Sequence, residues 1–395
     1  MEFQGSNCLR QRLVLSVLTG KAVKITGIRD KQQDSVGNYG LNESEMNLLK
    51  LMEKVTNGSD IYVDQRGTRL DFRPGLPYGG RVEHDCSLGR SIGYYLEPLL
   101  MLAPFCKHPL EARLTGITND RIDPSVDSLK HSSLAIIKQF LGGAADDDEL
   151  SITVESRGLA PAGGGCIVFK CPIRRYLRPI QSLDAGKVRR IRGLAYATRV
   201  SPQLANRMVA EAKGILLKYI PDIYIYTDHL KGPRSGKSRG FGLCLWAETT
   251  VPNGCCYVGD ACSHPSGSGK ETEAVAEDIA REATYALLND IYRGGAVDTQ
   301  SQPLCTLFMA FGQRDLSKVL LGPLSPFSIQ LFRHMKQFVD LTFKLDTQST
   351  ASSSTTAASA TNDDDMIDDE LRLGSTKLLA TCVGIGYTNL NKTVS

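Results

Sequence analysis

The chain has 395 residues, of which 42% are hydrophobic and 23% are charged, and its formal net charge at pH 7 is +3. This composition excludes fibrous and disordered proteins and provides enough apolar residues for two or three packed domains. No apolar run approaches the length of a membrane span, and the first residues lack the features of a signal peptide. We therefore expect a soluble, intracellular protein with no membrane partner.

The eleven cysteines are odd in number and lie mostly in apolar runs, which favours free thiols over a disulfide framework. The one cluster of metal-ligand residue types contains Cys255, Cys256, Cys262 and His264. It has no C-x-x-C pair, and adjacent cysteines on a strand point to opposite faces. We expect neither a metal site nor a cofactor.

The first 72 residues predict a helix, a strand, an amphipathic helix and two further strands. Asn42 is placed to cap the second helix, and Asn57-Gly58 is placed to end it. The expected elements are a helix at 9–18, a strand at 22–28, a helix at 43–55 and strands at 60–64 and 69–72.

The same order of elements occurs twice more, and in the second copy Asp123-Pro124 precedes the amphipathic helix. The second copy has a helix at 92–102, a strand at 111–118, a helix at 125–140 and strands at 150–156 and 166–171. The third has a helix at 304–311, a strand at 319–321, a helix at 326–338 and strands at 339–345 and 377–384. Three copies of one order predict a repeated architecture.

The segment between the second and third copies has its own pattern. It predicts a helix at 202–219, a strand at 222–226, strands at 242–248 and 256–260 and a helix at 271–292. We therefore expect a large domain, with its first two repeats in 1–186 and its third in 294–395, and a smaller α/β domain inserted at 187–293.

Residues 347–370 are rich in Ser, Thr, Ala and Asp, and they predict a disordered acidic loop. The loop contains six acids and no Lys or Arg, so the rest of the chain holds 46 basic residues against 37 acidic ones. This basic body favours a polyanionic partner. The strongest basic stretch, 170–192, contains one acid and includes Arg174, Arg175, Arg178, Arg189, Arg190 and Arg192. It is either an RNA-binding or protein-docking surface or an ordinary solvated face.

Two glycine-rich segments are candidates for anion binding. Arg157 precedes Gly163, Gly164 and Gly165, which lie between two strand-like runs. Bare backbone and a guanidinium are suited to phosphate oxygens, although a tight hairpin without a ligand has the same pattern. The second segment, 232–238, ends like a P-loop but is one residue short and precedes a strand. We interpret it as a loop that presents cations to a polyanion or an acidic partner, or as an ordinary exposed loop.

The pattern R-G-x-x-P-x-G-G-G-x-[LIV] resembles the signature of the RNA 3'-terminal phosphate cyclase family, and three units with an insertion before the third resemble its layout. The sequences RPGLPYGG at 73–80, IPDIYIYTDH at 220–229, LLGPLSP at 320–326 and TCVGIG at 381–386 resemble its non-catalytic, cyclase-like branch. The resemblance implies an α/β (α+β) fold of the RNA cyclase and EPSP-synthase-like type. Its large domain has three repeated units of two helices and four strands, and a smaller α/β domain is inserted.

The departures from the true cyclases predict that cyclase activity is lost. Those enzymes hold an adenylate on a histidine near the start of the third unit's amphipathic helix, whereas 322–329 contains no histidine and the nearest is His334. The nucleotide loop near the N-terminus keeps one glycine and Arg10, and the Asp-Gln pair is replaced around Gln302-Pro303. We expect a residual anion pocket formed by Arg10, Arg157 and the three-glycine backbone, unless these arginines are engaged in salt bridges.

The resemblance implies a nucleolar, hence nuclear, assembly factor for the 40S ribosomal subunit. It would act in early pre-rRNA processing within the small-subunit processome, as the partner of a ribosome-assembly GTPase. The alternative is an endoribonuclease that cleaves pre-rRNA, for which Arg333, His334 and Lys336 are the catalytic candidates. Against it, these residues point in different directions on one helix, as charges on a solvated helix face do.

Overall fold

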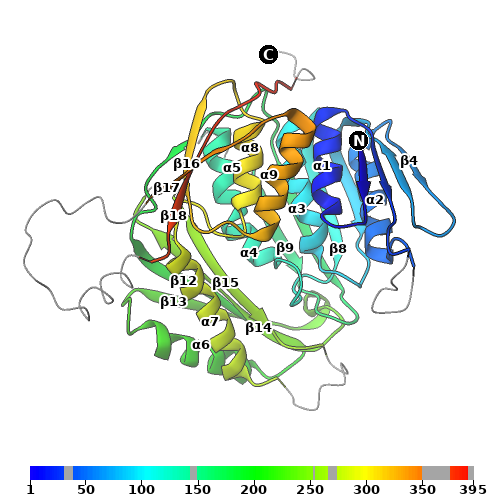
Figure 1. Cartoon of the computed structure of the whole chain (residues 1–395). Coiled ribbons are helices and arrows are strands. Elements are labelled where there is room, and N and C mark those ends of the chain that lie inside the picture. The colour runs from blue at the N-terminus through cyan, green and yellow to red at the C-terminus, as the bar shows by residue number, and fades with distance from the viewer. Residues whose placement is uncertain (31–38, 143–148, 252–253, 266–273, 349–373, 390–395) are drawn as a thin grey trace, which may run out of the picture.

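The computed structural model describes residues 1–30, 39–142, 149–251, 254–265, 274–348 and 374–389. Figure 1 shows an upper body, in which helices lie between sheets, and a lower lobe in which helices pack against a sheet. Each of three sheets in the upper body has four strands in the same relative order. The predicted α/β class is confirmed.

The first unit has strand order β1-β2-β5-β4, in which β1 is parallel to β2 and the other pairs are antiparallel. A capping box at Asn42, as expected from the sequence, begins the second helix of this unit. Its elements are β1 (Glu2–Gln4), α1 (Leu9–Thr19), β2 (Val23–Thr26), α2 (Glu43–Val55), β4 (Asp60–Val63) and β5 (Leu70–Arg73). The short strands β3 (Thr56–Asn57) and β6 (Leu76–Pro77) pair beside it.

The second unit repeats this topology as β7-β8-β10-β9. The helix predicted at 125–140 is two helices that meet at Ser132, and Ser125 rather than Asp123-Pro124 caps the first of them. The elements are β7 (Gly79–Asp85), α3 (Ile92–Leu102), η1 (Ala103–Phe105), β8 (His108–Gly116), α4 (Val126–His131), α5 (Ser133–Leu141), β9 (Ser151–Ser156) and β10 (Gly165–Cys171).

The third unit has the order β11-β16-β18-β17. Its elements are β11 (Gln181–Ser182), α8 (Gln302–Ala310), β16 (Leu316–Leu321), α9 (Pro326–Val339), β17 (Lys344–Gln348) and β18 (Lys377–Val383). Val339 therefore ends a helix and does not begin a strand. Thr347 and Gln348, predicted as loop, belong to β17, and the rest of the predicted acidic loop, 349–370, lies outside the described residues.

The inserted segment forms a sheet of order β13-β12-β14-β15. Its elements are β12 (Val188–Thr198), α6 (Pro202–Leu216), β13 (Ile223–Leu230), η2 (Gly232–Ser235), β14 (Gly240–Thr249), β15 (Cys256–Cys262) and α7 (Ala276–Arg293). Because β11 already belongs to the third sheet, the insertion lies inside the third unit, between β11 and α8, and not before that unit as expected. The central strand β12 was missed because its first half reads as a basic stretch.

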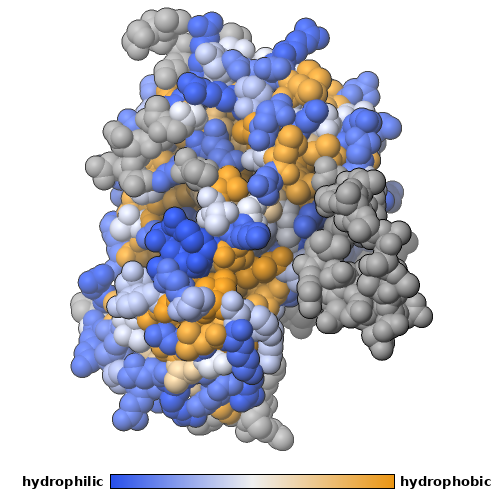
Figure 2. All heavy atoms as spheres, turned by 90° about the vertical axis from the view of Figure 1, so that its left-hand side faces the viewer, coloured by the Kyte–Doolittle hydropathy of each residue, from blue (hydrophilic) through white to orange (hydrophobic). Residues whose placement is uncertain are grey.

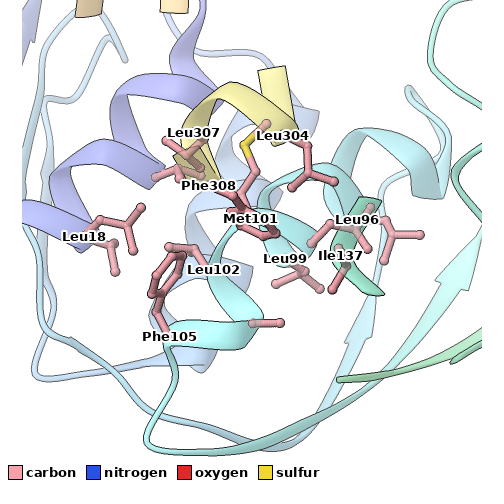
Figure 3. Packing of buried hydrophobic residues seen from close by; sticks show 14 of the residues in the cluster. Leu18, Leu96, Leu99, Met101, Leu102, Phe105, Ile137, Leu304, Leu307 and Phe308 are labelled. Atoms are coloured by element: carbon pink, nitrogen blue, oxygen red, sulfur yellow. The ribbon is translucent and has the colours of Figure 1, made fainter. Parts of the chain in front are cut away.

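Two large hydrophobic cores explain the two lobes, and a small third cluster of Leu159, Tyr196 and Cys262 lies between them. One core joins the helices of the three units, and the other joins the inserted sheet to α6 and α7. In the first, Phe308 lies with its ring centroid 5.8 Å from that of Phe105 and 5.4 Å from that of Phe140. Figure 3 shows the leucines, Met101 and Phe308 that converge there from α1, α3 and α8. Within the described residues, no helix is both long and apolar enough to span a bilayer.

Candidate functional site

The three-glycine turn packs against the glycine loop of the inserted segment. Gly163 and Gly164 have φ values of 59° and 86°, and Gly163 O accepts a hydrogen bond from Lys237 N at 2.9 Å. A Cβ on Gly236 would lie 2.8 Å from Gly163 O and closer still to Arg157 O. Glycine is therefore required for close backbone approach. The approaching group in the structure is protein backbone, as in the alternative of a tight turn without a ligand.

Arg157 is buried and fully engaged with protein groups. Its guanidinium lies 2.6 and 2.8 Å from the two carboxylate oxygens of Asp127 and 3.3 Å from Asp228 Oδ2, and its Cζ is 4.6 Å from the ring centroid of Tyr196. Burial alone would raise the pKa of Asp127, but the charge and hydrogen bonds of Arg157 outweigh it and lower the pKa to about 2. Arg157 thus forms a buried ion pair, which is the alternative of salt-bridged arginines that the sequence also left open.

Arg10 lines a different cavity, of about 450 Å³, which does not include Arg157. Its guanidinium pairs with Glu97, and its Cζ is 4.6 Å from the ring centroid of Tyr94. On the same ring, Arg90 lies 4.5 Å from the centroid and pairs with Asp123 at 2.6 Å. The predicted pocket of Arg10, Arg157 and the glycine turn is therefore not assembled.

The start of α9 contributes Ser325 and Phe327 to this cavity. Ser325 is the N-cap, and its Oγ accepts a hydrogen bond from Ser328 N at 3.1 Å. Gln302 Oε1 accepts hydrogen bonds from Ser325 N at 3.3 Å and from Ser328 Oγ at 3.1 Å. Hydroxyl, amide and phenyl groups thus occupy the position at which the resemblance requires an imidazole.

His334 lies on the buried side of α9, against α1. Its Nδ1 is 3.0 Å from Gln11 Oε1 and its Nε2 is 3.2 Å from Gln330 Nε2, which fits a neutral ring that donates from Nδ1 and accepts at Nε2. Burial, aided by the charge of Arg12, lowers the pKa of His334 to about 4. Because Arg333 and Lys336 are exposed, the structure does not bring the three nuclease candidates together.

The basic stretch divides between two places. Arg174, Arg175 and Arg178 lie in the connection between β10 and β11, whereas Arg189, Arg190 and Arg192 lie on β12 of the inserted sheet. On β12, Arg190 pairs with Glu248 at 2.6 Å and Arg192 with Asp222 at 2.8 Å. The stretch is therefore not one continuous patch.

Sequence reasoning missed the aromatic residues of the inserted domain. The rings of His131 and Trp246 stack with centroids 3.7 Å apart and an interplanar angle of 10°. Tyr224 and Tyr226 are both exposed on β13. The alternation of Ile and Tyr in 223–226 was a signal that these rings share one face of a strand.

Comparisons with known proteins agree with the architecture. The family model for RNA 3'-terminal phosphate cyclase matches residues 1–345. RNA 3'-terminal phosphate cyclase-like proteins of Homo sapiens and Bos taurus are each 50% identical over 394 residues, covering 100% of this chain and 98% of theirs. The rRNA processing protein rcl1 of Schizosaccharomyces pombe is 36% identical over 396 residues, covering 99% of this chain and 98% of its own. The chain therefore belongs to the RNA 3'-terminal phosphate cyclase family.

Proposed function

We propose that this chain is a non-catalytic factor of ribosome biogenesis that acts in pre-rRNA processing. Its similarity to the cyclase-like proteins and to an rRNA processing protein along their full lengths supports this role. We further propose that it works in the nucleolus on early 40S assembly, with processome components and a ribosome-assembly GTPase. RNA is the partner that a basic body favours.

The composition of the cavity at the start of α9 is the observation that argues most directly against cyclase chemistry. Covalent adenylation requires a nucleophilic nitrogen within near-contact distance of the nucleotide phosphate. Ser325 and Phe327 line the cavity, while His334 is 1% exposed and hydrogen-bonded to Gln11. Loss of a covalent nucleophile costs on the order of four to six powers of ten in turnover.

The enzymatic part of the proposal is tested by incubating the purified chain with labelled ATP and a 3'-phosphorylated RNA. We expect neither adenylylated protein nor a cyclic phosphate end, with a catalytic family member as positive control. A covalent adenylate on this chain would refute the proposal. Incubation with a pre-rRNA fragment should likewise give no specific cut by the wild-type chain. A cut that the wild type makes and that Arg333→Ala or Lys336→Ala abolishes would support the nuclease alternative.

The cellular part is tested by depletion followed by complementation. We expect early small-subunit precursors to accumulate on depletion. Expression of the wild-type chain should restore normal processing. Native purification should recover a large GTPase, and a tagged chain should localise to the nucleolus. Normal pre-rRNA levels in depleted cells would contradict the role in processing. Native purification that recovers no GTPase would contradict the proposed GTPase partner.

A further inference from the structure

The inserted sheet has one covered face and one partly open face. The covered face packs Ile191, Ile225 and Leu245 against α6 and α7. The other face is covered by α4 over β14 and β15, where His131 stacks on Trp246, and is closed at one end of β13, where Asp228 pairs with Arg157; along β13 it is open. In Figure 2, a cluster of hydrophilic residues lies beside a continuous apolar area near the level where the lower lobe meets the upper body.

Strand register places aromatic and cationic residues in rows on the open face. Tyr224 pairs with Arg192, which pairs with Trp246, and in the next row Tyr226 pairs with Leu194. Directly paired residues share a face of a sheet. The open face therefore presents the two tyrosines beside Arg192, whereas Trp246, 9% exposed and stacked on His131, forms the covered end of the row.

The two tyrosines are more exposed than packing on a sheet requires. Tyr224 is 54% exposed and Tyr226 is 51% exposed, although the isoleucines that alternate with them face the core. The centroids of the two tyrosine rings are 4.6 Å apart with an interplanar angle of 69°. One ring edge therefore meets the other ring, and both rings remain accessible to a flat ligand.

A hollow next to these rings contains cations. A cavity of about 240 Å³ is lined by Leu194, Lys130, His131 and Arg234, and an adjoining hollow of about 400 Å³ by His131, Trp246 and Arg189. The five carboxylates on these walls and at the end of the row are already paired with arginines: Asp127 and Asp228 share Arg157, Glu155 pairs with Arg113, Glu248 with Arg189 and Arg190, and Asp222 with Arg192. Within the described part of the chain, Lys130 and Arg234 have no carboxylate within 4 Å, so positive charge is in excess.

We propose that this face, formed by Tyr224, Tyr226 and the cations of the adjoining hollow, binds single-stranded RNA. Exposed rings stack on unpaired bases, and the cations meet the backbone phosphates. A duplex hides the faces of its bases and so fits the rings poorly. The inference rests on the proposed function for its RNA and adds the surface that contacts it.

The test uses fluorescence anisotropy of the full chain with a labelled single-stranded RNA of about 12 nucleotides and with the same sequence as a duplex. Stacking on one ring is worth about 5-fold to more than 100-fold in affinity. We expect Tyr224→Ala with Tyr226→Ala to weaken single-strand binding at least tenfold. Phe at both positions should restore it to within about threefold because the rings remain.

The matched control is Tyr285→Ala, which removes a tyrosine that is 57% exposed on α7. It should leave RNA binding unchanged, and thermal melting should confirm that all variants are folded. Wild-type binding equal to that of the double alanine variant would overturn the proposal, as would equal affinity for duplex RNA. If the chain binds no RNA but captures a protein through Tyr224 and Tyr226, the surface is a protein-docking site and the proposal is overturned.

The same variant separates this inference from the proposed function. If depleted cells accumulate precursors but the double alanine variant binds RNA normally, the surface is wrong and the proposed function stands. If depletion leaves pre-rRNA unchanged, the proposed function fails, whatever the anisotropy shows.

Discussion

Removing Arg157 should destabilise the protein severely and in a pH-dependent way. Arg157 and Asp127 are both buried, at 2% and 3% exposed, so Arg157→Ala leaves a carboxylate without its counter-charge. Breaking a buried pair from one side costs about 3–5 kcal/mol. The loss should exceed that of Arg207→Ala, which removes an exposed arginine paired with Glu277 at 2.7 Å.

The sign of the pH dependence follows from the pKa of Asp127. In the wild-type protein it is lowered to about 2 from its usual value of 3.8, so the pair contributes stability above pH 4 that is lost as the pH falls toward 2. In Arg157→Ala, the positive charge that opposes burial is gone, so burial raises the pKa of Asp127 above its value in the unfolded chain. The variant then loses stability as the pH rises, and the gap from wild type widens between about pH 4 and pH 7.

Urea unfolding at pH 4 and pH 7 measures this gap. Trp246, the one tryptophan of the chain, reports unfolding of the inserted sheet through its fluorescence. If Arg157→Ala fails to fold, Asp127→Leu with Arg157→Met supplies the second measurement, because removing both charges should recover most of the loss. A gap below about 1 kcal/mol at pH 7, or one of equal size at both pH values, would refute the ion-pair argument.

Three further outcomes are expected. Gly236→Ala should lower the free energy of unfolding, measured in urea, by at least about 2 kcal/mol, because the φ of Gly236 is +60° and a Cβ would meet the backbone of Gly163. Gly214→Ala in α6 is the control: a Cβ there would have no atom within 4 Å, so the change should be neutral or slightly stabilising. The pKa of His334 is lowered to about 4, so the neutral ring contributes to folding stability above pH 6.5, and this contribution declines as the pH falls toward 4. In His334→Gln, the free energy of unfolding should therefore vary less with pH over this range than in the wild type. Lys130→Gln with Arg234→Gln should reduce the slope of log affinity for single-stranded RNA against log salt by about 1.4, and an unchanged slope would exclude these cations from phosphate contact.

Local patterns predicted the elements whose signals are complete within the sequence. The helices at 43–55 and 92–102 agree with α2 and α3 because a capping box or a continuous apolar run defines each one. The strands β1, β7 and β11 were missed because each is fixed by parallel pairing with a distant strand. Gly79, for example, pairs with His108. The pattern of hydrophobic residues within such a short strand does not indicate which distant strand it will pair with.

The site was predicted less well because residue types do not reveal which partners are already present. Arg157 next to three glycines has the composition of an anion site, but Asp127 and Asp228 lie 30 and 71 residues away in the sequence and occupy its guanidinium. The two glycine segments were interpreted separately, and only the fold places their backbones in contact. Conversely, the exposed tyrosines of β13 had a readable alternation whose meaning depended on knowing that this face of the sheet is open.

The place of the insertion explains how the proposed RNA surface is held relative to the body. The chain leaves the third unit from β11, where Gln181 pairs with Lys318 of β16, and returns where Ala296 N donates to Leu320 O at 2.7 Å, again on β16. Both ends of the inserted domain are thus tied to one strand, and the contact between Gly163 and Lys237 ties it to the second unit. These attachments, together with the Arg157–Asp228 ion pair and the His131–Trp246 stack, restrict rotation more than a single linker would. Variants that loosen the glycine contact, such as Gly236→Ala, should therefore weaken RNA binding without touching Tyr224 or Tyr226, and unchanged affinity in a folded variant would contradict this coupling.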